Sequence, residues 1–352
     1  MKQTILFVGG GTLGPVTPLL AVLRRMKERC NDLDFVWIGT SSGPEKTLVE
    51  AEGVVFFAIQ EAKIPRYLSF KLLSWPLDYF RARLAAEKLV KKIRPSLVVS
   101  VGGFSSVPVM RAAKAMKIPC AIHQLDAEAG LANKAVASMC RLVSTSFKYD
   151  VQPFAGIISE QIATPSRFAG ASIPSKTEAA HFFGLEVDAP IVFLVGGGTG
   201  AVALNNAVDH HLEKILKLAQ VIHLTGKGKM GSEQKADGYV RREFFDEEQM
   251  LNAYAAADLV VSRAGMGAIT DLIALKKPAI LIPIPQSHQE SNADKTGFVI
   301  VRQVEGFEDR LIDKIASLLN SEVQLRRLVD AGHSVIKVDD GSALAKRWLE
   351  LL

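Results

Sequence analysis

Cysteine is scarce in this chain of 352 residues. Cys30, Cys120 and Cys140 are odd in number, stand far apart and form no C-x-x-C pair. This usage excludes a disulfide framework and offers no zinc-binding pattern. We therefore expect three buried thiols and no bound metal.

Long hydrophobic runs are also lacking. The apolar stretch at residues 278–285 is among the longest, and it falls far short of the roughly 20 residues that span a bilayer. The first residues lead from Lys2 through a short apolar run at 5–8 into glycines, without the apolar core and cleavage site of a secretory signal. The expectation is a cytoplasmic protein without a transmembrane helix.

Two enzyme signatures are missing as well. The chain contains neither a His-Glu-x-x-His motif nor a Walker lysine loop. These motifs supply the metal ligands of metalloproteases and the phosphate cradle of P-loop NTPases. Both classes are therefore excluded.

Charge is present but unevenly spread. Residues 1–160 carry 21 Lys and Arg against 13 Asp and Glu, a net charge of +8, although the whole chain has only +5. Residues 63–94 alone hold nine bases and two acids. Such asymmetry predicts an anionic partner for the N-terminal half.

The length exceeds what one compact core usually holds and predicts two domains of about 150 residues each. Short β-branched runs that end in glycine alternate with longer amphipathic stretches, which is typical of parallel sheets covered by helices. The expected strands are 4–8, 35–38, 54–58, 97–101, 120–123 and 142–144, then 191–195, 220–224, 259–262 and 279–282. We predict an α/β fold of two Rossmann-like domains facing across a cleft, at 1–162 and 163–342, with a last helix at 343–352 that packs on either.

Two glycine loops open helices in corresponding places. Gly9–Gly14 follows the first expected strand, and Gly196–Ala201 does the same in the second half. Backbone N–H groups at a helix N-terminus attract anions, but the G-x-G-x-x-G/A pattern alone is a weak dinucleotide signal. A dehydrogenase also needs an acid at the end of its second strand, and residues 39–41 and 225–227 contain none. This alternative is therefore disfavoured.

Three further strands end in polar or glycine-rich segments, at residues 100–106, 123–126 and 262–271. Ligands of open α/β sheets bind at the carboxyl ends of the strands. The predicted sites therefore lie on one rim of each domain.

Several segments follow one another in a characteristic order. They are the glycine loops at 10–21 and 101–106, the stretches 123–134, 164–167 and 197–201, and then 262–265, Asp271 and 288–293. In this order they resemble the motifs of the MurG glycosyltransferases, among them His-Glu-Gln-Asn…Asn-Lys at 123–134, Asn-Pro-x-Arg at 164–167, Gly-Gly-Ser-x-Gly-Ala at 197–201 and the nucleotide-sugar motif at 262–293. The resemblance covers nearly the whole chain. That family joins N-acetylglucosamine from UDP-N-acetylglucosamine to the undecaprenyl-pyrophosphoryl-muramyl peptide of peptidoglycan synthesis.

The resemblance implies a fold of the glycosyltransferase B type without a cofactor, with the acceptor on the N-terminal domain and the UDP-sugar mainly on the C-terminal one. The implied donor residues are Gly198, Thr199 and Gly200 at the pyrophosphate, Arg167 and Arg263 near the phosphates, Gly265 beside them, Asp271 at the ribose, and His288 and Gln289 at the sugar. The implied acceptor-side residues are Gly11, Thr12, Gly14, Phe104 and Asn133.

Departures from the family pattern lie on the acceptor side. Pro15 stands where the family has a histidine, and proline has no proton to exchange. Gln124 and Asp126 replace a glutamate and an asparagine, so Asp126 or His123 is the substitute candidate for a general base. A non-catalytic or divergent nucleotide-sugar-binding protein of the same fold is the alternative.

The basic stretch at 64–83 mixes aromatic residues and leucines with cations, a composition that suits anionic lipid headgroups. The residues concerned are Arg66, Lys71, Arg81 and Arg83 with Trp75, Tyr79 and Phe80. Core packing of the same apolar residues is the alternative, and nucleic acid lacks any recognised binding motif. We expect an enzyme bound peripherally to the inner face of the cell membrane, where a lipid-linked acceptor lies.

Overall fold

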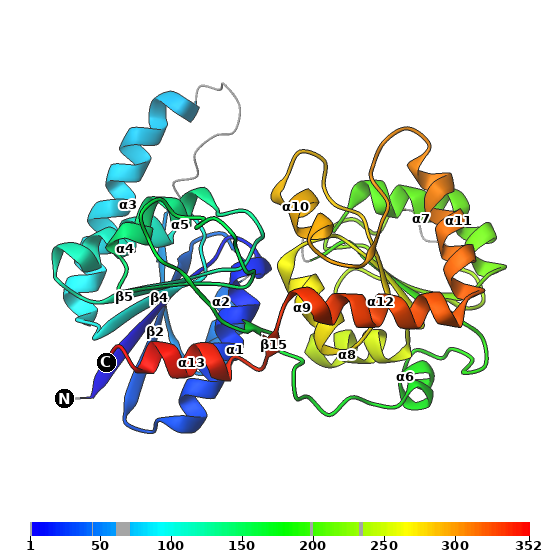
Figure 1. Cartoon of the computed structure of the whole chain (residues 1–352), viewed down its shortest axis with the longest axis horizontal. Coiled ribbons are helices and arrows are strands. Elements are labelled where there is room, and N and C mark those ends of the chain that lie inside the picture. The colour runs from blue at the N-terminus through cyan, green and yellow to red at the C-terminus, as the bar shows by residue number, and fades with distance from the viewer. Residues whose placement is uncertain (1, 44, 61–70, 198–199, 232–234) are drawn as a thin grey trace. The chain divides into compact units, whose positions relative to one another are not determined.

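The computed structural model describes residues 2–352 except 44, 61–70, 198–199 and 232–234. The chain forms two compact units, residues 1–167 with 338–352 (unit 1) and residues 168–337 (unit 2). Each unit is built around a parallel sheet (Figure 1). The structure therefore has the α/β class predicted from the sequence, with a parallel sheet in each of two domains.

Among the described residues of unit 1, seven strands form one sheet in the order β3-β2-β1-β4-β5-β6-β7. Its strands are β1 (Gln3–Val8), β2 (Leu33–Thr40), β3 (Val55–Ile59), β4 (Leu97–Ser100), β5 (Cys120–Gln124), β6 (Leu142–Thr145) and β7 (Glu160–Gln161). Its helices are α1 (Leu13–Arg29), α2 (Glu45–Ala51), α3 (Lys71–Ile93), α4 (Ser106–Ala115), α5 (Leu131–Val136), the short η1 (Ala137–Met139) and α13 (Ser342–Leu349).

Unit 2 repeats the plan, with six strands in the order β11-β10-β9-β12-β13-β14 among its described residues. The strands are β9 (Ile191–Val195), β10 (Gln220–Leu224), β11 (Tyr239–Arg242), β12 (Leu259–Ser262), β13 (Ala279–Leu281) and β14 (Val299–Ile300). The helices are α6 (Lys176–Phe182), α7 (Val202–Leu216), α8 (Glu247–Ala256), α9 (Met266–Ala274), α10 (His288–Asp294), α11 (Phe307–Leu319) and α12 (Glu322–Val335).

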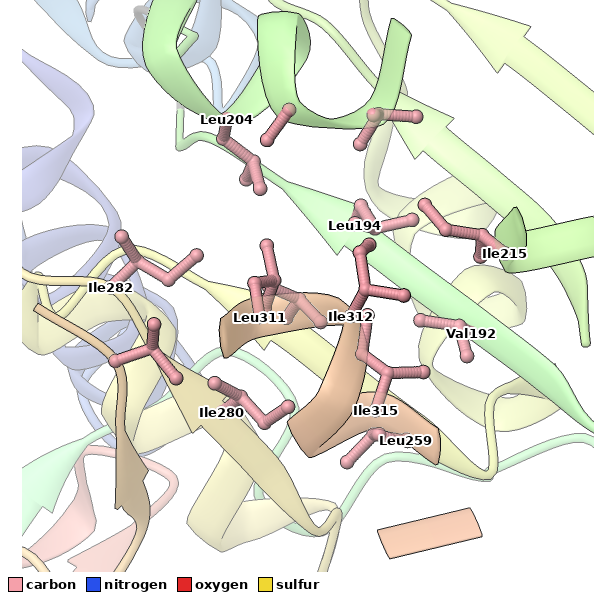
Figure 2. Packing of buried hydrophobic residues seen from close by; sticks show 14 of the residues in the cluster. Val192, Leu194, Leu204, Ile215, Leu259, Ile280, Ile282, Leu311, Ile312 and Ile315 are labelled. Carbon is pink, nitrogen blue, oxygen red and sulfur yellow. The ribbon is translucent and has the colours of Figure 1, made fainter. Parts of the chain in front are cut away.

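The central strands of the unit 2 sheet, β9, β12 and β13, are fully buried and consist almost entirely of apolar residues, as expected for a parallel sheet covered on both faces. Val192 and Leu194 of β9 pack into a cluster with side chains of α7 and α11 (Figure 2). Phe193, between them, points to the opposite face, where its ring lies 5.3 Å from that of Tyr254 on α8. Successive strand residues therefore support opposite helix layers, and the loops at the strand ends are held from both sides.

The end of the chain returns to unit 1. Strand β15 (Val338–Asp339) pairs in parallel with β8 (Thr164–Pro165), so the expected boundary at 162/163 falls just before a strand that belongs to this unit. Helix α13 then packs beside α1 (Figure 1). Trp348 of α13 is fully buried and meets Phe7 of β1 edge-on, with ring centroids 6.4 Å apart. The C-terminal helix is thus part of the unit 1 core.

The cysteines are free, but only Cys120 is buried, because Cys30 and Cys140 are partly exposed. The expectation of three buried thiols is therefore wrong for two of them. Within the described ranges, no helix is both long and apolar enough to cross a membrane.

Candidate functional site

Six of the expected donor residues follow strands of the unit 2 sheet: Gly200, Arg263, Gly265, Asp271, His288 and Gln289. Arg167 belongs to unit 1. Strands β10, β9, β12 and β13 are neighbours and parallel, so the loops that follow them leave the same edge. These loops are the second glycine loop, residues 225–229, residues 263–265 and the segment that leads into α10.

In its described residues, the second glycine loop consists mainly of glycines, so its surface is formed by backbone atoms. Gly200 has a φ of 69°, and a Cβ there would lie 2.2 Å from Thr225 O. Helix α7 starts next to the loop without a side-chain cap at Ala201. Lys229 Nζ lies 3.5 Å from Gly200 O, which brings a cation to the loop. An uncapped helix start beside a cation is a favourable place for an anionic ligand. Gly198 and Thr199 lie outside the described residues.

Arg263 is held at the end of β12. Only 8% of it is exposed, and its Nη1 donates to Ile282 O at 3.0 Å and to Gln303 Oε1 at 2.5 Å. Burial lowers the pKa of the guanidinium. The two hydrogen bonds fix the orientation of the Arg263 side chain. Because both acceptors are neutral, the positive charge of this buried guanidinium is not fully compensated. These two acceptors are a carbonyl and an amide oxygen, so neither contact is a salt bridge.

Helix α10 is tied to the loop after β12. The buried Asn292 Nδ2 donates to Ala264 O at 3.2 Å, and Gln289 Oε1 accepts from Ile284 N at 3.2 Å. A Cβ on Gly265 would lie 3.9 Å from Gln289 Nε2, so Gly265 and Gln289 are brought together.

Asp271 lies on the neighbouring helix α9 and is 6% exposed. It is the sixth residue of that helix, beyond the first turn in which an acid is stabilised by the helix dipole.

Two supporting residues of this edge were missed by sequence reasoning. Asn205 Nδ2 donates to Thr225 O at 3.0 Å, and its Oδ1 lies 3.1 Å from His223 Nε2. That ring nitrogen must then carry the proton, and Nδ1 accepts from Tyr239 Oη at 2.9 Å. Burial, with the charge of Arg241, lowers the pKa of His223 to about 3 and keeps it neutral. The signal was Asn205, a polar residue at a buried position of α7. Sequence alone does not distinguish such a position from an exposed one.

In unit 1 the corresponding edge joins the loops after β1, β4 and β5. A Cβ on Gly103 would lie 3.7 Å from Gly10 O, and one on Gly102 would lie 3.4 Å from Asn133 Oδ1. Gly11, Thr12 and Gly14 belong to the first of these loops and to the start of α1, and half-buried Phe104 to the second. Among the described residues Asn133 Oδ1 has no hydrogen-bond partner, although it is buried. Asn133 Oδ1 is therefore a fixed, buried acceptor beside Gly102.

His123 is part of the core and not of this edge. It is fully buried, and its Nδ1 and Nε2 lie 3.0 and 3.1 Å from the hydroxyls of Ser144 and Ser146. Burial lowers its pKa to about 3. A general base must reach the proton that it removes. The expectation that His123 could act as the base is therefore not supported, and Asp126, which is half-buried, is the remaining candidate.

Gln124 explains one departure from the family pattern. Its Nε2 donates to the carbonyls of Asp126 at 3.0 Å and Glu128 at 2.9 Å, and its Oε1 accepts from Asn133 Nδ2 at 2.7 Å. A glutamate could not donate either of the first two bonds. Gln124 therefore holds the loop that carries Asp126 and also orients Asn133.

The basic stretch is only partly described, because Arg66 lies outside the described residues, as does the side chain of Lys71. On α3, Leu77, Phe80 and Leu84 are 53%, 54% and 42% exposed and share one helix face. Of the expected interfacial rings, Phe80 is thus exposed. Trp75 and Tyr79 instead stack on each other at 5.6 Å, and the guanidinium of Arg111 covers Tyr79.

Metal binding has no support in the described portion of the chain, where no group of three His, Cys, Asp or Glu side chains is placed to hold an ion.

Comparisons with known proteins cover both units. Residues 5–145 match the family model "Glycosyltransferase family 28 N-terminal domain", and residues 191–332 match "Glycosyltransferase family 28 C-terminal domain". A relative from Lachnoclostridium phytofermentans is 40% identical over 288 residues, which are 81% of this chain and 79% of the relative. One from Clostridium botulinum is 33% identical over 349 residues, 97% of this chain and 96% of the relative. Both are named UDP-N-acetylglucosamine–N-acetylmuramyl-(pentapeptide) pyrophosphoryl-undecaprenol N-acetylglucosamine transferase.

Solved structures agree on the fold. The crystal structure of Acinetobacter baumannii MurG superposes with a TM-score of 0.73 at 20% identity, covering 99% of this chain and 100% of that one. The Staphylococcus aureus MnaA–UDP structure gives 0.71 at 11% identity, covering 100% and 98%. At these identities the likeness concerns the fold alone.

A test of the Gln124 contacts is to install the family's glutamate. In Gln124→Glu a carboxylate would face two backbone carbonyls, so we expect a loss of about 1–3 kcal/mol in the free energy of unfolding of unit 1. Urea denaturation followed by tryptophan fluorescence measures this unit, because Trp37, Trp75 and Trp348 all belong to it.

The matched control is Gln152→Glu. Gln152 Oε1 accepts from the backbone N–H and hydroxyl of Ser159, and a carboxylate keeps both bonds. Equal stability of the two variants would show that the amide of Gln124 does not hold the loop.

Proposed function

The chain belongs to glycosyltransferase family 28, and on this premise we propose that it transfers N-acetylglucosamine from UDP-N-acetylglucosamine to an undecaprenyl-pyrophosphate-linked muramyl peptide in peptidoglycan synthesis. The observation that carries the proposal is the 40% identity over 288 residues to a relative named for this reaction. The same relatives favour a transferase over a non-catalytic nucleotide-sugar-binding protein.

The donor is proposed to bind at the edge of the unit 2 sheet. Its pyrophosphate carries charge that the uncapped start of α7, the loop residues 198–200 and Lys229 can stabilise. Arg167 and Arg263 are proposed near the same phosphates. Asp271 would accept hydrogen bonds from the ribose hydroxyls, and Gly265, His288 and Gln289 would surround the sugar.

The acceptor is proposed to bind at the edge of the unit 1 sheet, where Gly11, Thr12, Gly14, Phe104 and Asn133 lie. In an inverting transfer, Asp126 takes the proton of the acceptor hydroxyl as the new glycosidic bond forms. The bond from the anomeric carbon to the phosphate oxygen breaks, and its electron pair leaves with UDP. Fixed amides and cations at the donor edge stabilise that charge as it develops. The reaction needs no redox cofactor.

The donor assignment predicts a loss of UDP affinity in Asp271→Ala. Removing hydrogen bonds to a charged acceptor costs about 1–3 kcal/mol, or roughly 5–150-fold in Kd. Isothermal titration of UDP measures the change, with circular dichroism to check the fold. Asp313→Ala, an exposed acid on α11, is the control and should bind UDP as the parent does. An unchanged affinity in Asp271→Ala would remove Asp271 from the donor site.

We also propose that α3 docks on the inner face of the membrane, where a polyprenyl acceptor lies. The exposed Leu77, Phe80 and Leu84 can enter the headgroup region, and the exposed Arg81 and Arg83 lie on the same helix. These arginines pair with Asp78 at 3.7 Å and Glu87 at 2.9 Å. Exposed pairs of this kind contribute little, so both arginines can exchange partners for lipid phosphates.

The docking proposal predicts salt-sensitive co-sedimentation with anionic but not neutral liposomes. Each cation near an anionic surface contributes about 1 kcal/mol, so Arg81→Glu/Arg83→Glu should lower the bound fraction at least about tenfold. Arg326→Glu/Arg327→Glu changes the net charge equally on exposed residues of α12 and should bind as the parent does. A parent protein that ignores anionic liposomes at low salt would end the proposal.

A further inference from the structure

The carboxylate of Glu45 lies inside the first glycine loop. Glu45 is the first residue of α2, and it is fully buried. It accepts hydrogen bonds from Thr40 N and Thr40 Oγ1, both at 2.6 Å, and from Gly11 N at 3.2 Å. The side chain therefore connects the end of β2 with the loop that joins β1 to α1.

Two glycines leave room for this carboxylate, and a side chain at either position would displace it. A Cβ on Gly10 would be 2.1 Å from Glu45 Oε1, and one on Gly43 would be 1.8 Å from Oε2. Thr40 Oγ1 also accepts from Gly43 N at 3.1 Å, so the same hydroxyl links Glu45 to the loop that precedes α2. The two loops thus form a closed cradle around an internal anion.

Backbone and hydroxyl donors, and not a cation, stabilise this anion. Among the described residues, no Lys, Arg or His lies within ion-pair distance of Glu45. The N–H and O–H groups that point at this buried carboxylate are donors of the kind that also bind a phosphate. A phosphate group at the same position would lose the Gly11 donor and would be repelled at short range.

The second glycine loop has the opposite charge. The side chain of Lys229 reaches Gly200 there, with Nζ 3.5 Å from the carbonyl oxygen. The two loops share the G-x-G-x-x-G/A pattern, but one receives an internal carboxylate and the other a cation. Their similar sequences therefore do not give them the same ligand.

We propose that Glu45 is a positioning and specificity-determining residue that occupies the anion position of the first glycine loop. Neither UDP nor the pyrophosphate of the acceptor binds to the Gly10–Gly11 backbone, because the carboxylate of Glu45 already does. The nucleotide is thereby confined to the second loop, and the first loop keeps one conformation at the acceptor edge. The statements about UDP and acceptor rest on the proposed function, whereas the occupied loop does not.

The direct test counts pyrophosphate sites by isothermal titration. Glu45→Ala empties the cradle, so this variant should bind one pyrophosphate more than the parent, and saturating formate should abolish the extra site by replacing the carboxylate. Glu50→Ala removes an exposed glutamate of the same helix that pairs with Lys46 at 3.8 Å, and should bind as the parent does. Equal numbers of sites in Glu45→Ala and the parent would overturn the proposal.

The extra pyrophosphate site expected in Glu45→Ala does not depend on the proposed function. If unit 2 binds no nucleotide, the parent shows no pyrophosphate site and Glu45→Ala still shows one. Failure of the donor assignment and failure of the Glu45 assignment therefore give different results.

Glu45→Gln is the second variant, since it keeps the side-chain volume if Glu45→Ala does not fold. Its amide would turn N–H groups toward backbone donors, so hydrogen exchange at Gly11 and Thr40 should be at least about tenfold faster. The acceptor KM should rise about tenfold at an unchanged donor KM, a split that a general loss of stability would not produce. Unchanged exchange together with an unchanged acceptor KM would overturn the positioning role.

Discussion

The parallel arrangement of the strands determines where chemistry can occur in this protein. Parallel strands need crossover helices, so all strands of a sheet start at one edge and end at the other. The apolar runs that form the strands are buried on both faces, as Val192, Phe193 and Leu194 show. Polar side chains are then left to the loops at the carboxyl ends. The described site residues other than Arg167 lie in such loops or in the helices that follow them.

The two glycine loops show how neighbouring side chains change the meaning of a motif. Glycine spacing produces a tight turn and uncapped amides in both, but Glu45 supplies an anion to one and Lys229 a cation to the other. A dehydrogenase would need an acid at the end of β2 to bind a ribose. The structure has Thr40 there, and it binds Glu45 instead. The loops are therefore adapted to different partners within one repeated fold.

The sequence predicts the buried strands well, because β-branched apolar runs are their direct signature. Strands β9, β10 and β12 have the predicted bounds. It does not predict β11 or β14, which lie at sheet edges, nor the pairing of β8 with β15, which joins residues more than 170 apart. Glu45 gave no signal either, because its partner Gly11 is 34 residues away and an acid at a helix start is ordinary. His123 was misjudged because its burial is a tertiary property, and the amide role of Gln124 depends on two carbonyls that only the folded loop brings together.

Transfer of sugar to the acceptor is the direct test of the proposed activity. The enzyme would be incubated with UDP-N-acetylglucosamine labelled in the sugar and with a lipid-linked muramyl peptide, and label would be followed into the lipid extract together with released UDP. We expect one sugar per acceptor and one UDP per sugar, with turnover at least about 100-fold lower in Asp126→Asn at an unchanged UDP affinity. A parent protein that binds UDP yet transfers no label to the acceptor would contradict the proposed activity.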